Sequence, residues 1–318
     1  MEIRMYQAGD ELKIVDLFQK VFKRPMSISQ WEWRFARNPN GNYKIALMWD
    51  KNVLAGHYAV SPVKMYFNGK TLKAASSLTT MTHPAYGGRG IFKTLSTYLY
   101  DILEREHNYE LIWGFPNVNS HYGFIKYLGW RDIATLHTLA ASSSEFKDVR
   151  KLPITKVDLF TSEMAYLLNS RAKESAVYVD RSKRYLNWRI VEKPSIDYDI
   201  WLLGSELIPE AILVTNWYHV KNNVFDLNIV DWVCKEGALL PMLIGSIIED
   251  SKINFKEIRR VALWNNLFKS SVYGILEKIG FKPELPITYL AGRTTLKSSP
   301  ALMSMKNWHI SFIDSDVY

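Results

Sequence analysis

The sequence contains a single cysteine, Cys234, in 318 residues, so no disulfide can form within the chain. A metal site built on several cysteines is excluded for the same reason, and we expect no bound metal. No apolar run approaches the roughly 20 residues that a membrane-spanning helix needs. The amino-terminal segment carries acidic residues within its apolar pattern and lacks the apolar core of a signal peptide. These absences predict a cytoplasmic protein with no membrane partner.

Stripes of Lys and Arg are also absent, although basic residues outnumber acidic ones by 40 to 32 and give a net charge of +8. Neither a helix-turn-helix signature nor zinc-finger spacing is present, so we expect no nucleic-acid partner. The scattered positive charge suits a solvated surface, and it also suits a small cofactor rich in phosphate. Hydrophobic residues make up 47% and charged residues 23%, as is typical of globular proteins.

The first half of the chain alternates between strand-like and helix-like patterns. After one strand and two helices, the pattern predicts strands at 43–49, 53–67 and 71–82, a helix from Ile91, a strand at 110–114, a helix at 120–128 and a strand pair within 130–141. An antiparallel meander followed by a crossover helix is typical of a mixed sheet. We therefore expect an α/β fold of the α+β type, with a mostly antiparallel sheet and helices on both faces.

The second half of the chain repeats the plan of the first. The segments SHYGFIKYLGW (Ser120–Trp130) and SVYGILEKIGF (Ser271–Phe281) share Ser, Tyr, Gly and Gly at identical offsets. Upstream, Trp33-Arg34 and Trp188-Arg189 each precede a proline by the same number of residues. We infer a domain duplication, with domains at 1–145 and 150–318, and the polar segment 142–151 is the candidate linker.

Three glycines, Gly87, Gly88 and Gly90, follow a predicted strand and lead directly into a predicted helix. Glycine allows a tight turn and a close approach of the backbone to a ligand. The first N–H groups of a helix have no intrahelical partner and lie at the positive end of its dipole, so they suit a pyrophosphate. Arg89 and Lys93 could add charge-assisted contacts. The alternative is a turn that needs glycine for steric reasons only.

This turn resembles the acyl-CoA-binding motif of the GNAT (Gcn5-related N-acetyltransferase) superfamily, on the strength of Thr-His-Pro at 82–84 and Tyr-Gly-Gly-Arg-Gly-Ile-Phe-Lys at 86–93. The segment 114–120, with the later Leu-Gly-Trp at 128–130, is similar to that family's second cofactor segment. The resemblance implies acetyl-CoA, or another acyl-CoA, as co-substrate. The residues that it assigns to this ligand are Thr80, Met81, Thr82, Gly87, Gly88, Arg89, Gly90, Ile91, Phe92, Lys93, Asn117, Asn119 and Ser120.

The resemblance covers residues 1–140 in order and, more weakly, 155–295. The tandem arrangement is similar to the two-domain GNAT enzymes of the enhanced-intracellular-survival type. Gly87 stands where the family usually has Arg or Gln, and Ile125 stands where it often has a tyrosine that serves as general acid. In the second half, the counterpart of the turn at 231–238 has one glycine. We therefore expect a degenerate second GNAT-like domain that does not bind coenzyme A.

Acyl transfer to an amine requires a base, a proton donor to the departing thiolate and a polarised acyl carbonyl. Tyr122 lies three residues from Ile125 and is the candidate donor. Its repeat partner Tyr273 lies in the degenerate half, so a packing role is the alternative. His83 and His121 are weaker candidates, and His83 precedes a proline at a strand end.

The carboxyl-terminal segment 308–318 alternates apolar residues in the manner of a docked strand. Some tandem GNAT enzymes are thought to use a terminal carboxylate as base, so the resemblance makes Asp314, Asp316 or the α-carboxylate of Tyr318 candidates. The alternative is a docked tail with solvated acids.

Taken together, these patterns predict a bacterial acyl-CoA-dependent N-acyltransferase that moves an acetyl group directly to a small amine or amino sugar, as a monomer or homodimer. Two alternatives remain at this stage. One is a GNAT-fold binding or regulatory protein without catalysis, which the missing tyrosine at Ile125 favours. The other is an aminoacyl-tRNA-dependent transferase of the peptidoglycan-bridge type, which the intact turn at 87–92 argues against.

Overall fold

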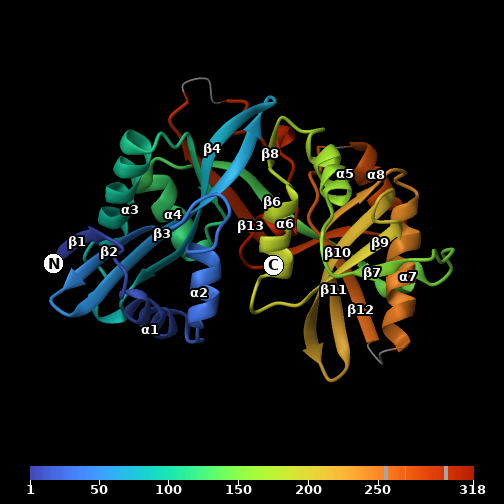
Figure 1. The fold of residues 1–318 in the computed structure, drawn as a ribbon, viewed down its shortest axis with the longest axis horizontal. Helices are drawn as coiled ribbons and strands as arrows, with labels where there is room; N and C mark the ends of the chain where they lie inside the picture. Colours follow the sequence, from blue (N-terminus) through green and yellow to red (C-terminus); the bar gives the residue numbers. More distant parts are fainter. Residues whose placement is uncertain (254–256, 269, 297–299) are drawn as a thin grey trace. The chain divides into compact units, whose positions relative to one another are not determined.

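The computed structural model describes residues 1–253, 257–268, 270–296 and 300–318 (Figure 1). The chain packs as two units, each with its own core. Unit 1 comprises Met1–Ala134 and Tyr289–Met303, and unit 2 comprises Thr135–Thr288 and Ser304–Tyr318. The units are interleaved because strands β6 (Arg131–Ser142) and β13 (Lys282–Thr294) each contribute residues to both. The contiguous domains 1–145 and 150–318 stay a prediction.

Unit 1 contains a meander, a crossover helix and helices on both sides of its strands. Its elements are β1 (Glu2–Met5), α1 (Glu11–Phe22), α2 (Ile28–Phe35), β2 (Lys44–Asp50), β3 (Val53–Phe67), β4 (Lys70–Thr82), α3 (Ile91–Asp101), β5 (Leu111–Gly114) and α4 (Val118–Leu128). The strand order is β1-β2-β3-β4-β5-β13, with β4 and β5 parallel and the other neighbours antiparallel.

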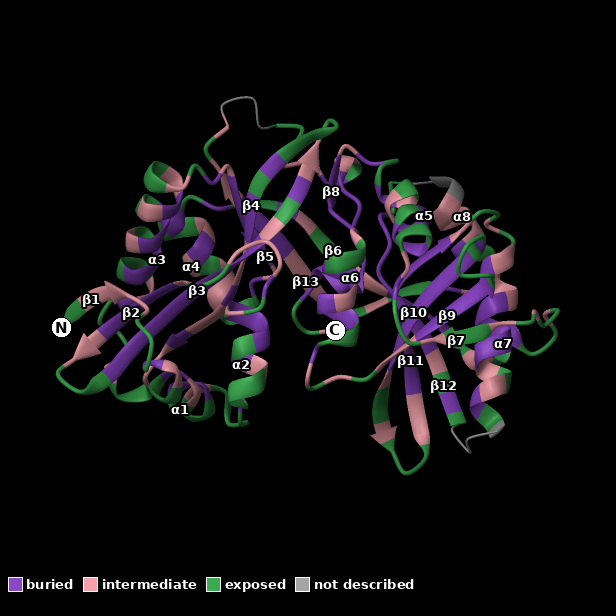
Figure 2. Cartoon of the chain, viewed as in Figure 1, coloured by how far each residue is buried: buried purple, intermediate pink, exposed green. Residues whose placement is uncertain are grey.

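Alternation along β2 shows how unit 1 builds a core on each face. Ala46 and Met48 pack with side chains of α3 and α4, whereas Ile45 and Leu47 pack with those of α1 and α2. Successive strand residues point to opposite faces, so an apolar run in β2 is buried on both sides. The prediction of a mixed sheet with helices on both faces is confirmed for this unit, and Figure 2 shows β3 largely in the colour of buried residues.

Unit 2 follows a similar element order. Its elements are β7 (Thr155–Val157), α5 (Ser162–Ala172), β8 (Val177–Val179), α6 (Lys183–Leu186), β9 (Tyr198–Gly204), β10 (Pro209–Lys221), β11 (Val224–Cys234), α7 (Leu239–Ile253), β12 (Glu257–Leu263) and α8 (Ser270–Ile279). The strand order is β6-β12-β11-β10-β9-β7, and β11 and β12 are parallel. The α7 helix packs over these strands together with Phe146 and Phe281.

Three expectations about local structure are wrong. The strand pair within 130–141 is one strand, β6, and the partner of β5 is β13, in which Ala291 faces Gly114. The expected linker at 142–151 contains Phe146, which is buried in the core of unit 2. The carboxyl-terminal segment is docked, with Trp308 and Phe312 fully buried, but it forms 3-10 turns and not a strand. In each case the local structure depends on packing with residues that are distant in the sequence.

None of the helices in the described ranges is long and apolar enough to cross a membrane.

Candidate functional site

Strand β4 carries a β-bulge near its carboxyl end, opposite β3. His57 faces Met81, whereas Ala59 faces Leu78, so β4 has one residue more than β3 in this interval. Thr79, within the bulge, has a φ of +53°, a left-handed conformation that costs a residue other than glycine about 1–2 kcal/mol. Bulges redirect the chain beyond them and are frequent next to active sites.

Two side chains stabilise the bulge through hydrogen bonds to Thr79, one to its carbonyl and one to its hydroxyl. His57 Nδ1 donates a hydrogen bond of 2.7 Å to the Thr79 carbonyl oxygen, and Arg34 Nη1 donates one of 3.1 Å to the Thr79 hydroxyl. Burial lowers the pKa of His57 to about 4, because a charged imidazolium would lose its hydration. The ring is therefore neutral at physiological pH, and Nδ1 carries its hydrogen.

The strands β4 and β5 separate beside this bulge. Their last parallel pair is Ser76 with Trp113, and β5 ends one residue later at Gly114. Strand β4 runs on to Thr82, and among the described strands none pairs with residues 77–82 on the side of β5. The backbone of this interval is thus left with an open edge. The predicted ligands Thr80 and Thr82 lie on that edge, whereas the Met81 side chain is buried against α1 and α2 and leaves only its backbone for a ligand.

The glycine turn between β4 and α3 presents unpaired amides to solvent. Gly88 and Gly90 have φ angles of +75° and +71°, and a Cβ added to either would meet no atom within 4 Å. The first hydrogen bond of α3 runs from the Thr94 N–H to the Gly90 carbonyl, at 3.0 Å. Within the described residues, no acceptor is placed at the N–H groups of Gly88, Gly90, Ile91 or Phe92. No side chain covers Gly88 or Gly90, so the amides of the turn can receive an anion.

Two cations flank the turn, both on exposed side chains. The Arg89 guanidinium lies 4.9 Å from the ring centroid of Tyr86, whose hydroxyl donates a 2.9 Å hydrogen bond to Asp50. This hydrogen bond raises the pKa of Tyr86 and keeps its hydroxyl protonated. Lys93 Nζ lies 5.8 Å from the ring of Tyr127. Aromatic faces thus steady both cations without neutralising them.

Helix α4 approaches α3 closely through Gly123. The Phe92 ring packs edge-on against Phe124 at 5.0 Å, and a Cβ at Gly123 would lie 2.9 Å from Phe92. The Phe92 side chain is therefore accommodated by α4, and its backbone remains at the turn. Ile125 packs against the same core.

Asn117 caps the amino terminus of α4. Its side-chain oxygen accepts hydrogen bonds of 3.0 Å from the N–H groups of both Asn119 and Ser120. The Ser120 hydroxyl donates to the same oxygen at 3.2 Å. Asn117 therefore carries the capping role at this helix end, and the assignment of Asn119 and Ser120 to a ligand stays a prediction.

Tyr122, the predicted proton donor, points away from the core. Tyr122 is 58% exposed, and its hydroxyl accepts a hydrogen bond from Lys126. Its ring lies edge-on to that of Tyr127, at 5.9 Å. The structure thus gives Tyr122 a solvated environment on the outer side of α4.

Asp314, a predicted base, belongs to a buried ion group in unit 2. Both of its carboxylate oxygens accept hydrogen bonds from Arg181, at 2.8 and 2.9 Å. The same guanidinium donates to Asp231 at 2.8 Å, and the Ser311 hydroxyl donates to Asp231 at 3.0 Å. Asp316 is exposed, and the Tyr318 carbonyl oxygen accepts hydrogen bonds from neighbouring cations. These contacts attach the carboxyl-terminal segment to β11.

The strands β11 and β12 separate in unit 2 much as β4 and β5 do in unit 1. Their last pair is Ile229 with Leu263, after which β11 continues to Cys234. The carboxyl-terminal segment lies here, because Asn266 Nδ2 donates to the carbonyls of Met305 and Trp308 at 2.7 and 2.6 Å. The place in unit 2 where β11 and β12 separate, which corresponds to the separation of β4 and β5 in unit 1, is therefore bonded to the carboxyl-terminal segment of the same chain.

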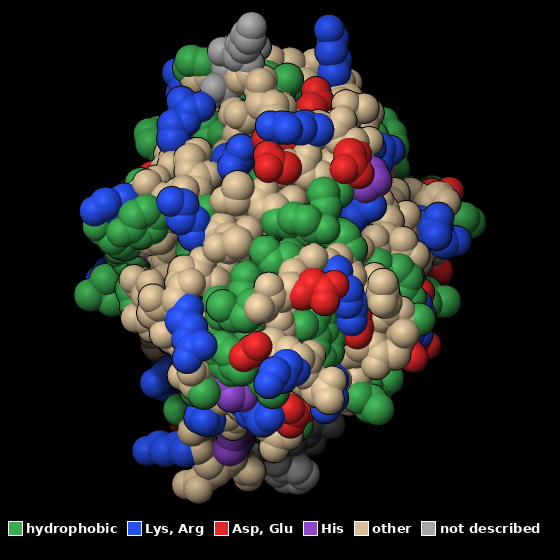
Figure 3. All heavy atoms as spheres, turned by 90° about the vertical axis from the view of Figure 1, so that its left-hand side faces the viewer, with side chains coloured by type: hydrophobic (Ala, Val, Ile, Leu, Met, Phe, Trp, Pro, Cys, Tyr) green, Lys and Arg blue, Asp and Glu red, His purple; other side chains and the backbone are tan. Residues whose placement is uncertain are grey.

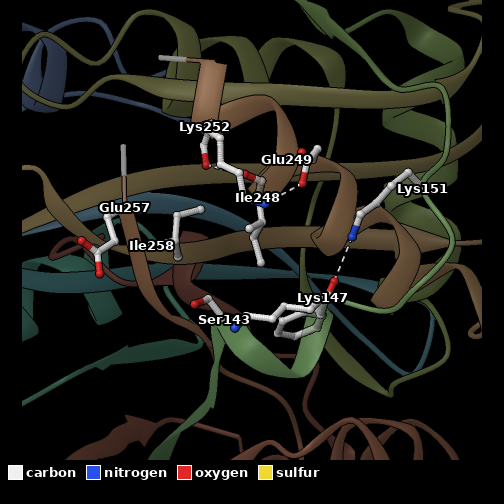
Figure 4. Close-up of a pocket in the computed structure, with 10 residues that line it drawn as sticks. Ser143, Lys147, Lys151, Ile248, Glu249, Lys252, Glu257 and Ile258 are labelled. Atoms are coloured by element: carbon white, nitrogen blue, oxygen red, sulfur yellow. Dashed lines mark hydrogen bonds and ion pairs between the residues drawn. The ribbon is translucent and has the colours of Figure 1, made fainter. Parts of the chain in front are cut away.

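Two pockets in the described part of unit 2 are candidate binding sites. One, of about 480 Å³, is drawn in Figure 4, where Lys252 pairs with Glu249 and Lys151 bonds the backbone of the facing turn. The other, of about 460 Å³, lies beside Cys234, and there Arg171 stacks on Trp232 at 3.7 Å. Burial raises the pKa of Cys234 to about 12, so its thiol is not a nucleophile at neutral pH.

The charges on unit 1 are dispersed. On the face shown in Figure 3, the described Lys and Arg side chains are mixed with acidic and apolar ones and gather into no single patch. Among the described residues, no three His, Cys, Asp or Glu side chains come together as a metal site requires. The glycine turn therefore remains the feature of unit 1 best suited to an anionic ligand.

The acetyltransferase (GNAT) domain family matches this sequence over residues 2–133. Residues 2–133 are a GNAT acetyltransferase domain. The matched residues include the bulge in β4, the ends of the paired part of β4 and β5, and the glycine turn. The GNAT family implies an acyl-CoA as co-substrate. No curated protein matches the sequence.

Solved structures extend the likeness of fold beyond the GNAT domain. A GCN5-related N-acetyltransferase from Anabaena variabilis superimposes with a TM-score of 0.71 at 14% identity, over 92% of this chain and 72% of its own. A GCN5-related N-acetyltransferase from Kribbella flavida gives a TM-score of 0.67 at 12% identity, over 94% of this chain and 72% of its own. At such identities the likeness concerns the fold alone.

Two side-chain contacts of unit 1 could not be predicted from the sequence. Nothing in the sequence links His57 to a bulge 22 residues away. Nothing in the sequence links His121 to Asp132, which lies beyond the end of its helix. Both depend on pairs of elements that only the folded chain brings together.

Proposed function

We propose that the chain is an acyl-CoA-dependent N-acyltransferase that transfers an acetyl group directly from the thioester to a small amine or amino sugar. The observation that carries this proposal is the open glycine turn at the start of α3, with its unpaired amides. A pyrophosphate is the ligand class that such a turn suits. The exposed cations Arg89 and Lys93 add charge of the right sign.

The open edge of β4 supports the same reading. A pantetheine arm carries amides, and amides can pair with backbone groups at Thr80 and Thr82 as a further strand would. We place Asn117, Asn119 and Ser120 on the far side of this arm. The turn and the open edge are consecutive in the chain, so one extended ligand can use both.

Unit 2 enters the proposal as a degenerate GNAT-like domain that does not bind coenzyme A. Its turn at 231–238 has one glycine. The carboxyl-terminal segment forms hydrogen bonds where its strands β11 and β12 separate. Tandem organisation of the enhanced-intracellular-survival type is part of this proposal.

A GNAT-fold binding protein without catalysis is the second candidate function. It is favoured by Ile125 at the position of the family's tyrosine and by the solvated environment of Tyr122. The aminoacyl-tRNA-dependent reading is disfavoured by the open turn, which such an enzyme does not need.

Calorimetric titration with acetyl-CoA tests the cofactor assignment. Gly90→Glu places a carboxylate at the turn, so we expect binding to weaken at least about 100-fold. Gly69→Glu is the matched control, because Gly69 has a similar φ of +76° with open space around it at the tip of the β3–β4 hairpin. We expect this control to bind as the native protein does. Failure of the native protein to bind acetyl-CoA would refute the assignment.

Release of free thiol in the presence of a panel of amines separates the enzyme from the binding protein. We expect thiol release that depends on both acetyl-CoA and an amine. Tight binding without thiol release on any amine would favour the protein without catalysis. Among the sequence-based candidates, Tyr122→Phe tests the thiolate donor, and Asp314→Asn and Asp316→Asn test the carboxylates.

A further inference from the structure

A histidine–carboxylate pair, His121 with Asp132, lies near the amino-terminal end of α4. His121 Nε2 lies 2.6 Å from Asp132 Oδ1, and the imidazole stacks on the Tyr289 ring with centroids 3.9 Å apart and planes at 16°. The three residues come from α4, β6 and β13, and all belong to unit 1. Contacts from two strands therefore hold the orientation of this ring.

One nitrogen of the His121 ring is able to accept a proton. An ionised carboxylate only accepts hydrogen bonds, so Nε2 of a neutral His121 carries the hydrogen that it shares with Asp132. Nδ1 then keeps its lone pair, and no described residue donates to it. The His121 side chain retains 21% of its exposure, so a small molecule can reach it.

The pair lies beside the predicted path of the acyl donor. His121 follows Ser120 directly, in the helix that begins just after the end of β5. It lies four residues before Ile125 and Tyr122 lies three residues before it, so both are near the same helix face, but the His121 side chain is 21% exposed whereas Tyr122 is 58% exposed. Tyr289 lies two residues before Ala291, which faces Gly114 at the end of β5. Ligands of sheets with a crossover commonly bind at these carboxyl ends.

We propose that His121, oriented by Asp132 and Tyr289, is the general base of the transfer; this inference rests on the proposed acyl transfer. Nδ1 takes a proton from the acceptor ammonium, and the neutral amine then forms an N–C bond to the thioester carbonyl carbon. The C–S bond then breaks, the nitrogen gives up its second proton to the departing thiolate, directly or through water, and the imidazolium returns the first proton to solvent. Protons and electrons balance with no further reactant. Asp132 is a positioning residue that stabilises the imidazolium.

The competing role for the pair is a structural clasp between α4 and β6. Two substitutions of His121 separate the roles. His121→Gln keeps an N–H donor for Asp132 but cannot take up a proton, and His121→Ala removes both properties. The ionisable groups in contact with the ring, among the described residues, are Asp132 and Tyr289. The exposed hairpin residue His219 supplies the matched control, His219→Gln.

The measurement is kcat/KM for acetyl-CoA-dependent thiol release between pH 5 and 9, with acetyl-CoA affinity by calorimetry for each variant. We expect His121→Ala and His121→Gln both to lose about 100-fold or more at neutral pH, the usual contribution of a general base. Both should also lose the fall in rate toward acid pH that an imidazole base produces. Affinity for acetyl-CoA should be unchanged, and His219→Gln should match the native protein.

Other results would overturn the inference. If His121→Gln keeps the native rate and pH profile, the pair is a clasp and the base lies elsewhere. If the native protein binds acetyl-CoA but releases no thiol with any amine, acyl transfer itself is refuted and the base with it. An active native enzyme with unaffected His121 variants refutes the base alone, so the two failures are distinguishable.

Discussion

At the scale of single residues, the conformation of Thr79 depends on a histidine that sequence patterns do not reveal. The left-handed conformation of Thr79 is unfavourable by itself and persists because neighbours hold both its carbonyl and its hydroxyl. A neutral imidazole suits this position, because a buried charge would have to be compensated. The site is thus shaped by a residue that need not contact a substrate.

His57→Leu should lower the free energy of unfolding by about 1–3 kcal/mol, because it leaves the half-buried Thr79 carbonyl without its donor. His57→Asn places an amide nitrogen near the former Nδ1 and should lose less. Chemical denaturation of both variants checks this order. Equal stability of the leucine variant and the native protein would contradict the role assigned to His57.

At the scale of elements, the carboxyl-terminal segment is attached to β11 by a fully buried guanidinium. Arg181 is 0% exposed and pairs with both Asp231 and Asp314, and a second cation, Arg171, lies 4.0 Å from Asp231. Removing one member of such a group leaves uncompensated charge in the core, which costs far more than breaking a pair at the surface. The predicted docking of the tail is thereby explained by a contact that its own apolar pattern did not indicate.

We expect Arg181→Met to lower the free energy of unfolding by about 3–5 kcal/mol. Lys252→Met is the matched control, since it breaks an exposed pair with Glu249, for which a loss of about 0–1 kcal/mol is expected. Thermal and chemical unfolding of the two variants gives the comparison. Similar losses for both would show that the buried group contributes no special stability.

At the scale of the whole molecule, the two units are connected by strands that each contribute to both. Unit 1 obtains the neighbour of β5 from β13, and unit 2 obtains the neighbour of β12 from β6. A fragment that ends at residue 145 would keep the entire acetyltransferase match but would lose the strand beside β5. The exposed edge of β5 would then be open to aggregation.

The fragment 1–145 should therefore fail to unfold cooperatively. A chain that joins 1–134 to 289–303 through a short linker should unfold more cooperatively. Circular dichroism and thermal unfolding of the two fragments measure the difference. Cooperative unfolding of 1–145 by itself would support the contiguous domain that the repeat pattern predicts.

The sequence by itself determined the features that depend on neighbouring residues. Glycine spacing before an apolar helix predicted the turn at 87–90, and the internal repeat predicted a duplicated element order, because backbone conformation and helical periodicity are local properties. Only the tertiary structure decided that β13 completes unit 1, that His57 holds Thr79 and that His121 meets Asp132. Each of these joins residues that are far apart along the chain or in different elements, and their pairing follows from which apolar faces pack together.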